Sequence, residues 1–223
     1  MTMESVQLKS GRAMALASCG LAAAVILPVL PIGRWIAPGN SISALLIREA
    51  VWWLYAAAAL IFLCLVERLP LSSIGLRRPT WKTLLFAVLG TMAALLVFAV
   101  HFGVIVRVFH LDAAVALEQR RIILSLPYWF RVLMVLRASV VEEILFRGYI
   151  IEKVRQLTGN AALAIALSVL TFTVAHFAGW GLVHLIPVFG VALVFALLYV
   201  WRRDLPCNVL AHFLTDGAGF LLR

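Results

Sequence analysis

Two adjacent glutamates and an arginine stand inside an apolar stretch of this chain of 223 residues. An ionisable side chain at the centre of a membrane helix costs roughly 2.5–3.5 kcal/mol on insertion scales, so such residues pair with one another or perform chemistry. Glu143 and Arg147 are four residues apart, acid before base, and can pair on one helical face. Glu142 points elsewhere and has no partner at that spacing, so we expect it to be the free carboxylate, suited to general base or acid catalysis. An ion-pair cluster that only orients the helix is the alternative interpretation.

Histidines occupy two later apolar stretches. Phe172 precedes His176 by four residues, and His212 precedes Asp216 by four, so each pair lies on one helical face. A carboxylate at that spacing can accept the ring N–H and fix the tautomer of the histidine. The alternative interpretation is a core or interface histidine with a satisfied ring for His176, and a buried polar pair that links two helices for His212 and Asp216. His184, beside a Gly-Trp-Gly hinge, is a weaker candidate.

The three sites together predict a polar pocket inside an apolar bundle, because intramembrane ionisable residues face the protein interior. Carboxylates and imidazoles can activate a water and polarise a carbonyl. They can also bind zinc or relay protons. Residue types do not choose among these chemistries, since the chain has no HExxH motif and no convincing GxSxG or catalytic-cysteine context.

The composition indicates an integral membrane protein. The chain is 64% hydrophobic and 13% charged, whereas a soluble domain is about a quarter charged. Its net charge of +9 comes from scattered Lys and Arg, which is typical of a cytoplasmic leaflet and not of nucleic-acid binding. The three cysteines have no zinc or redox spacing, and we expect no disulfide.

Seven apolar runs predict membrane spans, and their unbroken character favours helices over a barrel. The runs cover 13–32, 50–66, 83–106, 128–153, 161–177, 182–201 and 205–222. The first is long for a signal peptide, so we expect a retained span. The segment 107–127 mixes charges with apolar residues and fits an interfacial amphipathic helix.

We therefore expect an all-α, polytopic transmembrane helix bundle of about seven spans plus an interfacial helix. It would form one integral membrane domain, with the N-terminal spans and the interfacial segment in 1–127 and the catalytic core helices in 128–223. The bias of Lys and Arg favours an N-terminus inside. The basic residues expected inside are then Lys9, Arg12, Arg68, Arg77, Arg78, Lys82, Lys153, Arg155, Arg202 and Arg203. Those expected outside are Arg34, Arg48, Arg107, Arg120 and Arg121. The compact chain suggests a bacterial inner membrane.

The motifs resemble those of a known family. Glu-Glu-x-x-x-Arg at 142–147, Phe-x-x-x-His at 172–176 and His-x-x-x-Asp at 212–216 occur in that order. They are similar to the three motifs of the CAAX protease and bacteriocin-processing (CPBP, or Abi) intramembrane glutamic endopeptidases. The resemblance covers about 138–217, and the first three predicted spans carry no motif of this kind.

The resemblance implies hydrolysis of a peptide bond in a membrane-anchored or lipid-modified protein or peptide, within or near the lipid bilayer. Glu142 would be the base that activates water, and His176 would help to hold that water. His212 and Asp216 would lie on the oxyanion side. The family pattern allows Asn or Asp at the last position, and an ionised Asp cannot donate to an oxyanion. We therefore expect Asp216 to orient His212.

The remaining motif residues would support the site: Glu143, Arg147 and Phe172. No cofactor is expected, and zinc in a metal-dependent membrane protease is the alternative. A non-hydrolytic immunity or maturation factor on the same fold is a further alternative, although such a relative would be expected to have lost one of Glu142, His176 and His212. A proton-coupled carrier would often show repeated halves, which this chain lacks.

Overall fold

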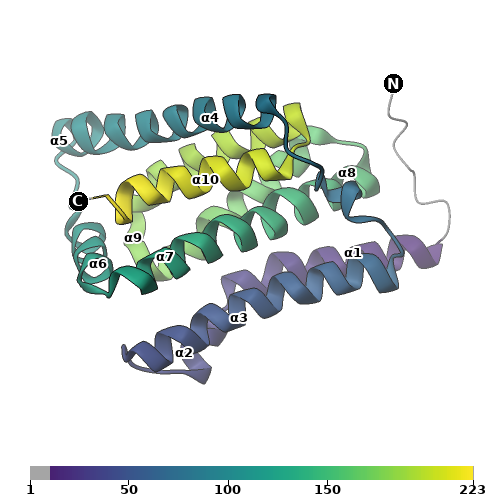
Figure 1. Ribbon diagram of the computed structural model, residues 1–223, viewed down its shortest axis with the longest axis horizontal. Coiled ribbons are helices and arrows are strands. Elements are labelled where there is room, and N and C mark those ends of the chain that lie inside the picture. Colours follow the sequence, from purple (N-terminus) through teal and green to yellow (C-terminus); the bar gives the residue numbers. More distant parts are fainter. Residues whose placement is uncertain (1–10, 223) are drawn as a thin grey trace.

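The computed structural model describes residues 11–222 of the chain. It is 86% helical, and no strand occurs among these residues. The predicted all-α, polytopic helix bundle is therefore confirmed (Figure 1). Residues 1–10 and 223 lie outside the described residues, and with them the predicted inside charge Lys9 and the outer limits of the predicted regions 1–127 and 128–223.

Helices follow one another along the chain with short connections. In order they are α1 (Gly11–Ile26), η1 (Leu27–Val29), α2 (Ile32–Ile36), α3 (Ile42–Ile61), η2 (Phe62–Val66), η3 (Leu71–Ile74), α4 (Trp81–Val100), η4 (His101–Ile105), α5 (Val106–Val108), α6 (Ala114–Ser125), α7 (Tyr128–Arg137), η5 (Ala138–Ile151), α8 (Glu152–Thr158), α9 (Ala161–Arg202) and α10 (Leu205–Phe220). Of the η elements, η1 and η3 are 3-10 turns, whereas η2, η4 and η5 are π-helical.

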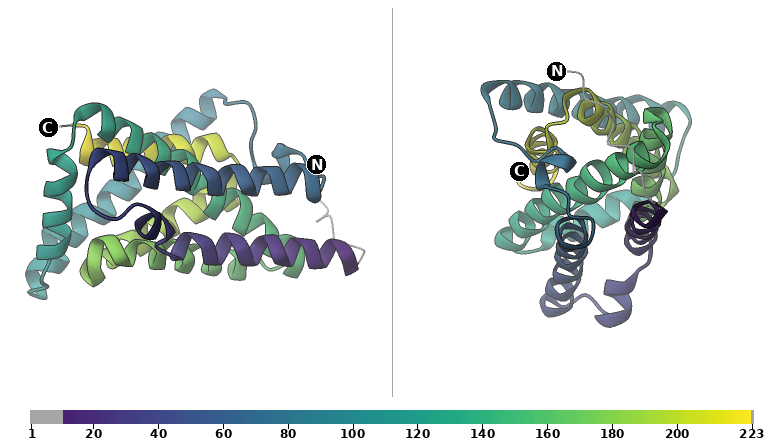
Figure 2. Two further views of the ribbon diagram at one scale, coloured as in Figure 1. Left: turned by 90° about the horizontal axis from the view of Figure 1, so that it is seen from below. Right: turned by 90° about the vertical axis from the view of Figure 1, so that its right-hand side faces the viewer.

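The helix that carries the two glutamates lies at the centre of the bundle. α7, η5 and α8 continue one another without a break, and 12 of the 14 residues of η5 are buried. η5 packs against α9 and α10 on one side and against α1 and α3 on the other, while α4 covers α10 (Figures 1 and 2). One apolar core joins Ala56 of α3 and Ile74 of η3 to Val141 and Phe146 of η5. The two predicted regions thus share a core, and their boundary stays a prediction.

α9 consists of two antiparallel arms. Its 42 residues would form a straight rod of about 63 Å, roughly twice the hydrocarbon thickness of a bilayer. Gly181, at φ 72° and ψ 172°, breaks the helix in the middle. Near the end of the second arm, the hydroxyl of Tyr199 donates to Glu152 of α8, the helix that precedes the first arm. The chain therefore reverses at Gly181, where the sequence predicted a hinge.

The two helices that carry the histidines begin at side-chain caps. The side chain of Asn160 accepts the backbone N–H of Leu163 at the start of α9, and Asp204 accepts that of Cys207 at the start of α10. Such a cap satisfies a backbone donor that has no partner inside the helix. Asp204 also forms an ion pair with Arg77, 3.1 Å between Oδ2 and Nη2, which ties the start of α10 to the loop before α4. These contacts set where the histidine helices begin.

α6 lies across one end of the bundle and bends by 120° against the helix that follows it (Figure 2). Its 12 residues extend about 18 Å, too short to cross a bilayer, which agrees with the predicted interfacial helix. Within residues 11–222, four helices are long and apolar enough to cross a membrane, or five if the bent pair is one span. The predicted count of seven treats the arms of α9 and the 16-residue α10 as separate spans, and it stays a prediction.

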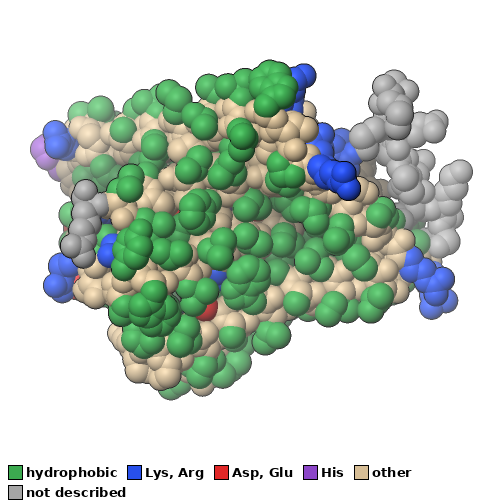
Figure 3. Space-filling view, in the orientation of Figure 1, with side chains coloured by type: hydrophobic (Ala, Val, Ile, Leu, Met, Phe, Trp, Pro, Cys, Tyr) green, Lys and Arg blue, Asp and Glu red, His purple; other side chains and the backbone are tan. Residues whose placement is uncertain are grey.

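Basic side chains gather at the two ends of the molecule, and apolar side chains cover the face between them (Figure 3). At one end Lys153 pairs with Glu67, and Arg203 pairs with Glu152. At the other, Arg34 donates to the carbonyl of Ala178. This arrangement is typical of a protein that spans a membrane.

Candidate active site

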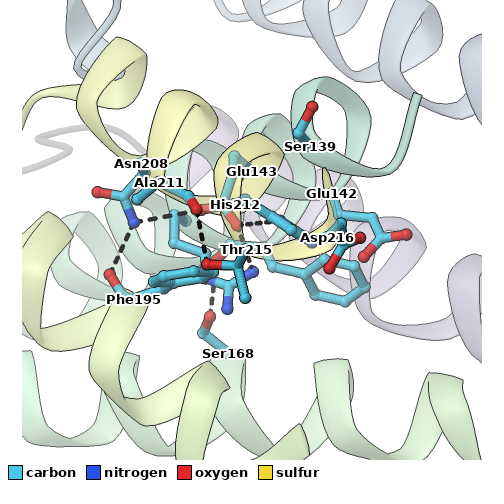
Figure 4. A network of polar contacts seen from close by, with 12 residues as sticks. Ser139, Glu142, Glu143, Ser168, Phe195, Asn208, Ala211, His212, Thr215 and Asp216 are labelled. Atoms are coloured by element: carbon cyan, nitrogen blue, oxygen red, sulfur yellow. Dashed lines mark hydrogen bonds and ion pairs between the residues drawn. The ribbon is translucent and has the colours of Figure 1, made fainter. Parts of the chain in front are cut away.

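Glu143 is the most enclosed carboxylate of the structure's central cluster. Its side chain and that of Arg147 are both 0% exposed, and Nη1 of Arg147 donates to Oε1 of Glu143 at 2.9 Å. Nδ2 of Asn208 donates to Oε2 at 3.2 Å, and Nδ1 of His212 lies 2.9 Å from Oε1 (Figure 4). The ion pair predicted from the spacing of four residues is confirmed. Every oxygen of Glu143 is therefore engaged by protein donors.

Glu142 is not the free carboxylate that the sequence predicted. Nη1 of Arg137 donates to its Oε1 at 2.7 Å, and both side chains are about nine-tenths buried. The two residues are five apart, a spacing that does not bring side chains together on an α-helix. They meet because the chain turns into the π-helical η5 directly after Arg137, and a π-turn bonds residues five apart. The other oxygen, Oε2, accepts no hydrogen bond from the residues that the structure describes.

His176 faces that second oxygen. Its Nε2 lies 3.9 Å from Oε2 of Glu142, while its Nδ1 lies 2.8 Å from the backbone carbonyl of Phe172. A carbonyl only accepts, so the hydrogen of a neutral His176 is on Nδ1 and Nε2 presents its lone pair to Glu142. The predicted pairing of Phe172 with His176 on one face is thus realised through the backbone of Phe172.

His212 is held between two carboxylates. Glu143 accepts from Nδ1, and Oδ2 of Asp216 lies 3.4 Å from Nε2. The side chain of His212 is 6% exposed, whereas that of Asp216 is 25% exposed. The spacing of four residues therefore brings His212 and Asp216 together as predicted. The orienting contact at Nδ1 comes from Glu143, a contact that the sequence did not indicate.

Aromatic rings enclose the charged cluster. The guanidinium of Arg147 lies 4.3 Å from the ring centroid of Phe172 and 5.7 Å from that of Phe195. The Phe172 ring also contacts His176, with centroids 4.5 Å apart. Such apolar walls exclude water and strengthen the electrostatic interactions inside them. Phe172 therefore lies in the cluster as predicted, as a wall shared by Arg147 and His176.

His184 lies apart from the carboxylates, in agreement with the sequence analysis, which made it a weaker candidate for the site. Its ring stacks on Trp180 with centroids 4.3 Å apart, and the rings of Phe98 and Phe102 lie near it. No ion pair joins it to a carboxylate of the described residues. It belongs to an aromatic cluster beside the hinge of α9.

Sequence reasoning missed three residues of the cluster. Arg137 and Asn208 could have been selected from the sequence, because each is a polar residue inside a predicted apolar run. Asn208 also precedes His212 by four residues. Glu49 carried no such signal. It stands 88 residues before Arg137 and meets it only through the fold, with Nε of Arg137 2.8 Å from Oε2 of Glu49.

A metal would need several of these side chains as ligands. Among the described residues, no group of three or more His, Cys, Asp and Glu side chains is arranged to hold one. The carboxylates are instead held by arginines: Glu142 by Arg137 and Glu143 by Arg147. A zinc site would have to displace or rearrange these pairs.

Comparison with protein families identifies the region that contains the three motifs of this cluster. Neither the curated proteins nor the solved structures include a significant match to the chain. Residues 124–218 match the family described as type II CAAX prenyl endopeptidase Rce1-like, and every motif residue named above lies within them. Residues 124–218, less than half of the chain, therefore resemble the CAAX endopeptidases, and the family resemblance indicated by the three motifs is confirmed.

Proposed function

We propose that this protein is a CAAX-type intramembrane endopeptidase that hydrolyses a peptide bond in a membrane-anchored or lipid-modified protein or peptide. The family match supports an endopeptidase of this general type. The apolar face between two basic ends supports an integral membrane location (Figure 3). We place the protein in a bacterial inner membrane, with the bilayer and an anchored polypeptide as its partners.

One observation carries the proposed mechanism: Oε2 of Glu142 and Nε2 of His176 face each other at 3.9 Å, and both are acceptors. A water can bridge them, because two hydrogen bonds of about 2.8 Å reach further than this separation. Such a water donates one hydrogen to each residue and turns its lone pairs outward. Glu142 then takes the proton as the water oxygen attacks the scissile carbonyl.

The oxyanion formed by that attack needs a donor. We assign this role to Nε2–H of His212 in its imidazolium form, which carries a hydrogen on both ring nitrogens and directs Nδ1–H to Glu143. Asp216 keeps the ring in place through its contact with the same Nε2. The proton held by Glu142 passes to the leaving amine, which restores the carboxylate. We propose no resident metal for this reaction, since water activation is assigned to the carboxylate.

Proteolysis in reconstituted vesicles tests the proposal. Purified protein is mixed with a library of membrane-anchored peptides, prenylated and unmodified, with and without a chelator. We expect wild-type cleavage to survive chelation and Glu142→Gln to lower kcat by roughly 100- to 10,000-fold, the usual contribution of a general base. Glu118→Gln, an exposed glutamate on α6, is the matched control and should cleave like the wild type.

Three results would contradict the proposal. Full activity of Glu142→Gln would remove Glu142 as the base. Loss of cleavage on chelation, restored by zinc, would replace the proposed mechanism by a metal-dependent one that uses the same residues. A protein that cleaves no member of the library would favour the non-hydrolytic alternative.

A further inference from the structure

The cluster described above extends beyond the Rce1-like region. Glu49 belongs to α3, 75 residues before that region begins at residue 124. The residue is buried, 9% exposed, and its carboxylate forms a bidentate pair with Arg137: Nε lies 2.8 Å from Oε2 and Nη2 lies 3.2 Å from Oε1. Arg137 in turn reaches Glu142 with its remaining nitrogen, Nη1, at 2.7 Å.

We propose that Glu49 is a positioning residue for the reaction, acting through Arg137 to hold the carboxylate of Glu142. The inference rests on the proposed function for its catalytic meaning. It adds that an N-terminal helix outside the family region is part of the catalytic apparatus.

The geometry of the guanidinium explains how one carboxylate controls the other. Arginine presents its N–H groups in a rigid planar fork, and a bidentate carboxylate fixes the plane of that fork. With the Nε and Nη2 edge occupied by Glu49, only Nη1 contacts Glu142, and only at Oε1. Oε2 then stays directed to His176.

α3 adds a second contact that keeps Arg137 in place. The guanidinium carbon of Arg137 lies 5.4 Å from the ring centroid of Trp52, which follows Glu49 by three residues and so lies on the same face of α3. A released guanidinium could instead turn and bind both oxygens of Glu142, the stronger bidentate arrangement. The second oxygen would then be unavailable to water. Glu49 prevents this by satisfying the other edge of Arg137.

Glu49→Gln tests the inference because it keeps the shape of the side chain and removes the charge and one acceptor. We expect kcat to fall roughly 100-fold, the cost of misplacing a catalytic group by about an ångström, while KM changes less than about twofold, since Glu49 is not assigned to substrate binding. Glu49→Asp keeps the charge and should recover part of kcat. If Glu49→Gln lowers only the yield of folded protein and leaves kcat per folded molecule unchanged, the inference is overturned.

Glu67→Gln is the matched control. Glu67 directly follows η2, which continues α3, and it stands 18 residues after Glu49, or about 27 Å along the helix axis. Its side chain is buried in an ion pair with Lys153. The control makes the same chemical change at the other end, so its kcat should stay within about twofold of the wild type. A loss in Glu67→Gln equal to that in Glu49→Gln would mean that any buried charge on this helix matters equally, which contradicts positioning.

The path through Arg137 has its own test. If Glu49 acts only through Arg137, then adding Glu49→Gln to Arg137→Gln should lower kcat no further. A further loss of about 100-fold in the double variant would show that Glu49 acts by another route. Because the double variant removes both partners, it avoids the uncompensated buried carboxylate that Arg137→Gln alone leaves at Glu49.

An experimental structure of Glu49→Gln separates this inference from the proposed function, since it requires no cleavage. We expect Arg137 to contact both oxygens of Glu142. An unchanged Glu142, with Oε2 still facing His176, would overturn the positioning role even if the wild type cleaves. If Glu142 is rearranged in the Glu49→Gln structure and the wild type cleaves no peptide, the positioning role would be supported and the proposed function contradicted.

Discussion

At the scale of single residues, two neighbouring glutamates occupy different electrostatic surroundings. Glu143 is fully buried and receives donors from Arg147, Asn208 and His212. Glu142 has one oxygen held by an arginine and the other directed at an imidazole. A carboxylate that is saturated with donors is a structural support, whereas one with an unengaged oxygen can accept a proton. The difference follows from which face of η5 each side chain occupies.

This difference predicts how the Glu143–Arg147 pair responds to substitution. Arg147→Gln leaves a buried carboxylate without its cation, and we expect the free energy of unfolding to fall by roughly 3–5 kcal/mol, as for other broken buried pairs. The double variant Glu143→Gln/Arg147→Gln removes both charges and should lose less stability than Arg147→Gln. Denaturant unfolding in mixed micelles measures both. A double variant that is fully stable but inactive would contradict a mainly supporting role.

Asp216 allows a sharper test of the oxyanion side. Asp216→Asn keeps an oxygen that can accept from Nε2 of His212, so only the charge of the acceptor is lost. We expect kcat to stay within about tenfold of the wild type, because a hydrogen bond to a charged acceptor exceeds a neutral one by only about 1 kcal/mol. Asp216→Leu offers no acceptor and should lose more. Equal and complete loss in both variants would indicate that the negative charge itself is required.

At the scale of elements, the break in α9 places the motif histidine. Gly181 has φ 72° and ψ 172°, a conformation that is essentially restricted to glycine. A Cβ there would also lie 3.2 Å from Cγ1 of Val115 on α6. His176 stands five residues before this break, on the first arm, whose Ser168 donates to the backbone carbonyl of Phe146 on η5. The turn at Gly181 therefore couples the position of His176 to the helix that closes the end of the bundle.

Gly181→Ala should accordingly lower the free energy of unfolding by roughly 1–3 kcal/mol, the usual cost of a residue forced into such a conformation. Gly179→Ala is the matched control. It is helical, and the nearest atom to an added Cβ is Nη2 of Arg34 at 3.9 Å, so alanine there should be neutral or slightly stabilising. Denaturant unfolding of the two variants in the same micelles provides the comparison. Equal stability would show that the break does not need glycine.

The elements also show why the sequence predicted some contacts and not others. The pairs Glu143–Arg147 and His212–Asp216 follow from the α-helical spacing of four residues, and both are present. The contact from Arg137 to Glu142 does not follow from that spacing, because no feature of the local sequence predicts that the helix becomes π-helical after residue 137. The apolar runs predicted the helices, since burial in lipid acts on composition, whereas the side-chain partners depend on how those helices pack.

At the scale of the whole molecule, the site is assembled from distant parts of the chain. Glu49 comes from α3, the glutamates from η5 and the histidines from α9 and α10. The long-range pair between Glu49 and Arg137 could not be predicted from one sequence, because no periodicity relates residues 88 positions apart. The N-terminal helices therefore contribute both to the shared apolar core and to the polar cluster.

The distribution of charge predicts how the molecule sits in its membrane. Nine of the ten Lys and Arg residues predicted to lie inside, all but Lys9, belong to the end where Lys153 pairs with Glu67 and Arg77 pairs with Asp204. The five residues predicted to lie outside belong to the opposite end. Because cytoplasmic segments carry the excess of Lys and Arg, we expect the end with nine to face the cytoplasm. Arg78 lies exposed at that end, and Arg107 lies exposed at the other.

Single cysteines at these two positions test the orientation. Cys19, Cys64 and Cys207 are unpaired and would first be replaced by alanine. In bacterial spheroplasts that express the protein, a membrane-impermeant maleimide should label Arg107→Cys at once and Arg78→Cys only after the membrane is opened. The reverse pattern would mean that the end richer in basic residues faces outward, contrary to the charge bias. Labelling of both positions in intact spheroplasts would contradict a single orientation, because each position would then be reachable from the same side.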